Sequence, residues 1–248
     1  MIDAHMHFNL KDESPFDALM NQIRENEIAR FVLILNTDEE KKLFYEAKDK
    51  LDTSGTPYSL VFLLKPGNEP DMHEFTNLSK NGLSPHIKFH PRLSNIHRDD
   101  FSLAAQTLER CPSNVIVVDC FAYGHKVETH IGINLALYLA EKFPEKKIVM
   151  AHSGGVDVMK AMLYSRTLRE NIFFDLSLTC NYFAGSSLQQ DIVHFIKFDY
   201  SRIMFGSDYP DFTSKSAAEI TLQLVQNAGL SQEKQEDVFF NNAIKIYW

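Results

Sequence analysis

Asp3-Ala4-His5-Met6-His7 lies in a short, mostly apolar stretch at the start of the chain. Alternate residues of a strand point to the same face, so His5 and His7 are expected side by side, roughly 7 Å apart. Two neutral imidazoles on one face provide half of a metal site. An open, doubly wound sheet usually carries a glycine-rich phosphate-binding turn after its first strand, and here that turn is His-Met-His-Phe-Asn. The stretch therefore favours a barrel.

Apolar runs alternate with helical patterns along the rest of the chain. Buried strands are expected at residues 1–8, 30–36, 58–64, 86–91, 115–120, 147–152, 172–177 and 202–208. Helices are expected at residues 14–23, 37–51, 72–81, 99–110 (before Pro112), 131–143, directly after 153–155, 188–198, 217–227 and 232–247. Eight strand-then-helix units without a break in composition predict parallel pairing and a single (β/α)8 barrel domain over residues 1–248.

Composition and charge exclude several classes of partner. The 248 residues carry a formal net charge of −8, whereas nucleic acid and anionic membranes reward a basic face. No apolar run approaches the roughly 20 residues of a membrane helix, and no basic leader precedes the first strand. Cys111, Cys120 and Cys180 are scattered, which is typical of reduced thiols. We expect a soluble cytoplasmic protein without nucleic-acid or membrane partners.

Polar residues gather at the predicted strand ends, and the active site of a barrel lies at the carboxyl ends of its strands. Four of the ten histidines are among them. Chance placement would scatter histidines over helices and loops, so the convergence predicts a divalent-metal site. The residues at these ends are His5, His7, Lys88, His90, Asp119, Cys120, His152, Asp175, Ser177 and Asp208.

Ligand chemistry suggests a role for the first and last of these groups. His5 and His7 are expected to bind the metal through neutral imidazole nitrogens. Asp208 is expected to be both a metal ligand and the general base toward an activated water. The alternative roles of Asp208 are an N-cap for the next helix or an ion-pair partner of Arg202.

Three further residues allow more than one role. His152 is a metal ligand, a cationic group that polarises the substrate's oxygen, or a cap for the following helix. Lys88 and His90 share a strand face and are predicted to bind a substrate carboxylate. Their alternative is an internal ion pair with an acid such as Asp119, and a carboxylated Lys88 that bridges two metals is a further option.

Five segments follow one another along the chain in a family-like order: Asp3-Ala4-His5-Met6-His7, Ile87-Lys88-Phe89-His90-Pro91, residues 148–155 around His152-Ser153-Gly154-Gly155, Phe205-Gly206-Ser207-Asp208-Tyr209-Pro210 and residues 242–247. Together they resemble the amidohydrolase superfamily, in particular the amidohydrolase-related (amidohydrolase-2) branch that includes aminocarboxymuconate-semialdehyde decarboxylase. The resemblance implies a distorted (β/α)8 barrel with one divalent metal, commonly zinc. It implies His5, His7 and Asp208 as ligands, with His152 as a catalytic residue beside a single metal or a ligand in a two-metal site.

One position departs from the pattern of this family. Many relatives carry a histidine ligand at the end of the fifth strand, where this chain has Asp119 and Cys120. Carboxylate and thiolate are both accepted zinc ligands, and the register of the strand decides which one points inward. The expected function is a metal-dependent hydrolase acting on a small, carboxylate-bearing molecule. A metal-dependent decarboxylase and a degenerate ligand-binding barrel are the alternatives, and relatives suggest a homodimer.

Overall fold

Eight parallel strands form one sheet in sequence order and curl into a barrel. The computed structural model describes residues 1–111 and 113–248. After the last strand, the chain closes the barrel against the first: Ala4 N donates to Phe205 O at 3.0 Å, and Met6 pairs with Tyr209. The predicted (β/α)8 barrel is confirmed. The strands are β1 (Ile2–Met6), β2 (Arg30–Leu35), β3 (Tyr58–Leu63), β4 (His86–Phe89), β5 (Val115–Asp119), β6 (Lys147–Ala151), β7 (Ile172–Asp175) and β8 (Ile203–Met204).

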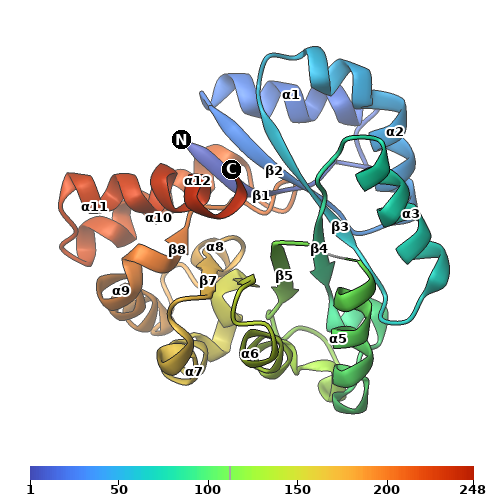
Figure 1. Ribbon diagram of the computed structural model, residues 1–248. Helices are drawn as coiled ribbons and strands as arrows, with labels where there is room; N and C mark the ends of the chain where they lie inside the picture. Colours follow the sequence, from blue (N-terminus) through green and yellow to red (C-terminus); the bar gives the residue numbers. More distant parts are fainter. Residues whose placement is uncertain (112) are drawn as a thin grey trace.

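Helices surround the strands (Figure 1). Single turns α4 and α8, which directly follow β4 and β7, are additional to the helices expected from sequence. None of the helices in the described ranges is long and apolar enough to cross a membrane. Pro112, expected after the helix at 99–110, lies outside the described residues. The helices are α1 (Pro15–Glu25), α2 (Asp38–Thr53), α3 (Glu69–Lys80), α4 (Pro91–Ser94), α5 (Phe101–Arg110), α6 (Gly132–Lys142), α7 (Val158–Tyr164), α8 (Thr179–Tyr182), α9 (Leu188–Asp199), α10 (Ser214–Asn227), α11 (Gln232–Glu236) and α12 (Asn242–Tyr247).

The predictions for residues 202–208 and 232–247 were wrong in detail. Strand β8 ends at Met204, because the chain from Phe205 onward turns toward β1 instead of continuing along β7. A Cβ at Gly206 would lie 3.0 Å from the Cβ of His5, so any other residue here would push against β1. The C-terminal helix is interrupted by a π-helical turn at 237–241, whose Val238 carbonyl accepts from Phe205 N at 2.9 Å. A carbonyl released from the α-helical pattern thus anchors the last strand.

Apolar side chains pack in two clusters, one inside the barrel and one between the sheet and the helices. The inner cluster is closed at the amino-terminal end of the barrel by Tyr247 and Ile246 of α12. It includes alternate residues of strands such as β1, β2 and β5: Val115 and Val117 of β5 belong to it, and the next residue in that alternation is Asp119. The carboxyl end of the barrel, called the mouth below, is therefore where the inward-facing positions become polar.

Gly132 is where the amino end of α6 presses against the end of β5. A Cβ at this position would lie 2.1 Å from Asp119 O and 2.8 Å from Cys120 Cα. We expect Gly132→Ala to reduce the free energy of unfolding by roughly 3 kcal/mol, because backbone must move to admit the methyl group. Urea denaturation measures the change. Asn134→Ala on the same helix is the control, with a change of less than about 0.5 kcal/mol; equal stability of the two variants would contradict the close contact.

Candidate metal centre

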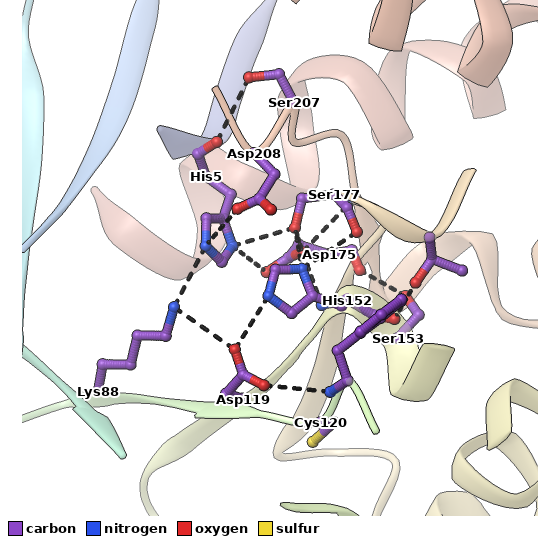
Figure 2. A network of polar contacts seen from close by, with 12 residues as sticks. His5, Lys88, Asp119, Cys120, His152, Ser153, Asp175, Ser177, Ser207 and Asp208 are labelled. Carbon is purple, nitrogen blue, oxygen red and sulfur yellow. Dashed lines mark hydrogen bonds and ion pairs between the residues drawn. The ribbon is translucent and has the colours of Figure 1, made fainter. Parts of the chain in front are cut away.

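Polar side chains from strands far apart in the sequence meet at the mouth (Figure 2). Donor atoms of His5, His152 and Asp208 all lie within 4.8 Å of one another, and the three residues are buried. They come from β1, from the turn after β6 and from the segment after β8. The structure thus brings together three of the residues that the sequence placed at strand ends.

His5 is held in one orientation by Asp175. Its Nδ1 lies 3.1 Å from Asp175 Oδ2, and because an ionised carboxylate only accepts hydrogen bonds, Nδ1 carries the proton. Burial lowers the pKa of His5 to about 4 even though Asp175 opposes the shift. The imidazole is therefore neutral, and Nε2 keeps its lone pair, as metal ligation requires.

His7 is oriented in the same way by a residue that the sequence marks only as a helix cap. Glu40 Oε2 accepts from Thr37 N at 2.9 Å and from Asn36 N at 2.7 Å, which caps α2. Its other oxygen, Oε1, lies 3.1 Å from His7 Nδ1. Nδ1 therefore donates to Glu40, and Nε2, 3.8 Å from Asp208 Oδ1, is the His7 nitrogen placed to bind a metal.

Glu40→Gln tests this arrangement. The amide oxygen can keep the cap, but the NH2 group must then face His7 Nδ1 and force the proton onto Nε2. We expect the dissociation constant for Zn²⁺ to rise about 10- to 100-fold in a chelator-competition titration. Thr37→Ala is the matched control: it removes the hydroxyl that accepts from Glu40 N at 3.2 Å, costs about 1 kcal/mol of stability and leaves metal affinity unchanged. Equal weakening in both variants would assign Glu40 to the helix alone.

Asp208 is positioned by backbone, not by a charge partner. Its N–H donates to His5 O at 2.9 Å, and its φ of 61° turns the carboxylate over the first strand. Helix α10 is capped by Thr213, and Arg202 pairs with Asp199 at 2.7 Å. The two alternative roles that the sequence allowed for Asp208 are thus filled by other residues.

The donor atoms face one another in a way that fits a cation. Asp208 Oδ1 lies 3.3 Å from His5 Nε2 and 3.8 Å from His7 Nε2. Asp208 Oδ1 and His5 Nε2 are both acceptors, and the Lys88 ammonium lies 3.4 Å from that nitrogen. Two acceptors this close need a positive charge beside them: Lys88 supplies one, and a divalent ion bound between them would supply it directly. Two ligands of a tetrahedral zinc ion, each about 2.0–2.1 Å from it, lie roughly 3.3 Å apart. The residues present therefore fit a divalent metal.

His152 has the opposite character, because both of its ring nitrogens face acceptors. Nε2 lies 3.1 Å from Asp119 Oδ2, and Nδ1 lies 3.2 Å from Ser177 O. Both nitrogens must donate, so the ring is an imidazolium. Burial alone would lower the pKa of His152, but the carboxylates of Asp119 and Asp208 raise it to about 9. A protonated ring cannot ligate a metal without giving up these contacts.

The fifth strand presents Asp119 to this cluster and directs Cys120 away from it (Figure 2). Asp119 Oδ2 lies 3.1 Å from His152 Nε2, 3.4 Å from His90 Nε2 and 3.9 Å from Lys88 Nζ. Burial would raise the pKa of Asp119, but His90 and His152 hold it well below its usual range. The thiol of Cys120 lies 3.3 Å from Val118 O, and burial raises its pKa well above the usual value. Asp119 is thus the counter-ion of His152 and Lys88, and it also contacts His90, whose pKa burial lowers to about 3.

Lys88 is nearly inaccessible, at 1% exposure, and its ammonium lies between His5 Nε2 (3.4 Å) and Asp119. His90 is also buried against Asp119. These contacts match the internal ion pair that the sequence left as an alternative.

Sequence reasoning had no role for Asp175 and Glu40 in orienting histidines. Position at a strand end pointed to Asp175, whereas Glu40 was visible only as a cap.

An open pocket of about 620 Å³ lies above the cluster. Its floor includes His7, Lys88, His90, His152 and Asp208. Apolar and aromatic side chains from the loops form much of its wall, as is usual for small-molecule sites. They are Phe8, Leu10, Leu93, Phe121, Tyr123, Leu178, Tyr182 and Phe212.

Comparison with known proteins assigns the family. The profile of the family described as Amidohydrolase matches residues 82–248, more than half of the chain. The chain belongs to the amidohydrolase family. This match includes β4 to β8 and the residues Asp119, His152 and Asp208, and it identifies the protein as an enzyme of the amidohydrolase type. No curated protein matches the sequence.

Solved structures of amidohydrolases and related enzymes share the barrel. A probable 2-pyrone-4,6-dicarboxylic acid hydrolase from Acinetobacter baumannii, with citric acid bound, superposes with a TM-score of 0.70 at 14% identity, covering 99% of this chain and 98% of that one. An amidohydrolase from Burkholderia multivorans with bound zinc gives 0.58 at 14% identity, with the same coverage. Dihydroorotase from Campylobacter jejuni gives 0.65 at 15% identity, covering 99% and 82%. At these identities the likeness establishes the fold alone.

Proposed function

We propose that this amidohydrolase hydrolyses an amide, ester or lactone bond of a small carboxylate-bearing molecule, with one bound divalent ion, expected to be zinc. The observation that carries the proposal is the approach of Asp208 Oδ1 to two histidines at the mouth, to His5 Nε2 at 3.3 Å and to His7 Nε2 at 3.8 Å. The zinc in the Burkholderia amidohydrolase and the dicarboxylic substrate named for the Acinetobacter enzyme support the choice of ion and of substrate class.

The roles of the residues follow from their protonation states. A divalent ion held by His5, His7 and Asp208 lowers the pKa of water at the site. Asp208 turns one oxygen toward the two imidazoles, which leaves the second oxygen to accept a proton from the attacking water. His152 is cationic and stabilises the negative charge that develops on the substrate's carbonyl oxygen. Asp119 maintains that charge through its contact with His152 Nε2.

Metal removal and reconstitution test this proposal. The protein is stripped with a chelator, reconstituted with Zn²⁺, and assayed against N-acyl amino acids and carboxylated lactones, with carbon dioxide release monitored in parallel. We expect about one ion per chain by elemental analysis, hydrolysis that disappears in the stripped protein, and recovery with the ion. Full hydrolysis without metal would overturn the metal site. Carbon dioxide release without hydrolysis would favour a decarboxylase, and absence of metal binding would favour a degenerate barrel.

The remaining expectations belong to the same proposal. The chain acts as a single barrel domain in the cytoplasm, with a small molecule and not nucleic acid as its partner, and pairs as a homodimer. The net charge of −8 supports the exclusion of nucleic acid. Light scattering of the purified protein tests the dimer, for which a mass close to twice 28.5 kDa is expected.

A further inference from the structure

Arg92 is a basic residue of the pocket that neither the strand-end pattern nor the proposed chemistry accounts for. It lies in the first turn of α4, two residues after His90 and four after Lys88, and all three line the pocket. Lys88 and His90 are buried against Asp119, so their basic groups are directed inward. Arg92 is only partly buried and continues the same row outward toward the open part of the pocket.

The guanidinium of Arg92 has no partner within the described residues. Its Nε atom is covered and makes no hydrogen bond, and the residue makes no ion pair with any acid in ranges 1–111 and 113–248. Three other arginines of the chain pair with acids: Arg110 lies 2.6 Å from Glu69, and Arg169 and Arg202 lie 3.0 and 2.7 Å from Asp199. Of the arginines without an ion pair in the described ranges, Arg92 is the one that lines the pocket at the mouth. A partly buried cation without a counter-ion is costly, so an anion from outside would compensate it.

Three of the four acids that share the pocket with Arg92 are engaged elsewhere. Asp119 contacts His152 and His90, Glu40 contacts His7 and caps α2, and Asp208 faces His5 and His7. Asp211, the fourth acid of the pocket lining, makes no ion pair within the described ranges, with Arg92 or with any other base. The pocket therefore offers a ligand one unpaired guanidinium on the side of β4.

A neighbouring aromatic ring holds the guanidinium in place. The carbon Cζ of Arg92 lies 5.6 Å from the centre of the Tyr123 ring, within the range of a cation–π contact. Tyr123 comes from the loop after β5, is 54% exposed, and lines the same pocket as Arg92. A planar guanidinium fixed by its face presents its edge to an acceptor, which suits a bidentate carboxylate.

We propose that Arg92, steadied by Tyr123, is the subsite that binds a carboxylate of the substrate. This inference rests on the proposed function, which it sharpens: the carboxylate is recognised by Arg92 and not by the buried Lys88 and His90. Strands β4 and β8 lie on opposite sides of an eight-stranded barrel, and the reacting bond lies near Asp208 after β8. The substrate therefore carries its carboxylate several bonds from the bond that is cleaved, at the other end of the molecule.

Binding of glutarate to the chelator-treated protein tests the subsite without metal or turnover. By isothermal titration at pH 7, we expect glutarate to bind the wild type and its neutral diamide, glutaramide, to bind at least tenfold more weakly. Arg92→Gln should weaken glutarate binding about 10- to 100-fold and leave glutaramide unaffected, and Arg92→Lys should give an intermediate loss. Arg166→Gln, on a surface groove away from the mouth, is the control and should bind like the wild type.

Two results would overturn the subsite. One is glutarate affinity in Arg92→Gln within twofold of the wild type. The other, which needs no variant, is equal affinity of the wild type for glutarate and glutaramide. Because the titration uses metal-free protein, failure of the hydrolase proposal would leave these results intact. Conversely, a hydrolase that cleaves neutral and carboxylated substrates equally well would contradict the subsite and preserve the metal chemistry.

Discussion

Asp208→Asn should lower kcat/KM for hydrolysis by about 10³-fold or more. Asparagine keeps the shape of the side chain and one acceptor oxygen, but it cannot accept the proton of the attacking water. Burial raises the pKa of Asp208, yet His152 and His5 bring it below its usual value, so the wild-type carboxylate is ionised at neutral pH. Steady-state kinetics of the reconstituted protein, with metal content measured on the same samples, give the result.

Asp211→Asn is the matched control for this variant. Asp211 also lines the pocket, but its side chain makes no ion pair with the imidazoles of His5 and His7 within the described part of the chain. We expect its kcat/KM to stay within about threefold of the wild type. More than a tenth of wild-type activity in Asp208→Asn with normal metal content would remove Asp208 from the role of general base.

Asp119→Asn should destabilise the metal-free protein by about 3 kcal/mol at pH 6, because it leaves the charged His152 and Lys88 buried without their carboxylate. In the wild type, Asp119 and Asp208 raise the pKa of His152 to about 9 against the effect of burial. A raised pKa stabilises the folded state fully below the unfolded value of about 6.5, and this contribution is lost as the pH rises through 9. The difference in the free energy of unfolding between wild type and variant should therefore become smaller above pH 9.

Urea denaturation of chelated protein from pH 5 to 10 measures this difference. The low pKa of Asp119 itself adds stability above about pH 4, which is lost only in stronger acid, so the gap is widest between about pH 4 and 6.5. The alkaline limb of the activity profile should also move to lower pH.

Metal content should remain near wild type in Asp119→Asn and in Cys120→Ala. Loss of the ion in either variant would make that residue a ligand.

The sequence was sufficient for the order of elements because periodic burial is a local signal. Continuous apolar runs such as Val115–Asp119 marked strands buried on both faces, and the Thr37 and Glu40 pair marked the start of α2. Irregular segments could not be predicted from this local signal. Strand β8 is only two residues long, and the helix at 232–247 contains a π turn. Both irregularities occur where Phe205 N donates to Val238 O, a tertiary contact that the local sequence pattern does not reveal.

His5, His7, His152 and Asp208 could be chosen from the chain by residue type and position at strand ends. What the sequence by itself determined was this inventory, since parallel strands that alternate with helices must bring their carboxyl ends together. Only the tertiary structure decided protonation and direction. Asp175 and Glu40 approach their histidines across 170 and 33 residues, and the register of β5 turns Asp119 inward and Cys120 outward. The position of a proton depends on which acceptor lies within hydrogen-bond distance. A local sequence pattern does not predict the distance between residues that are far apart in the chain.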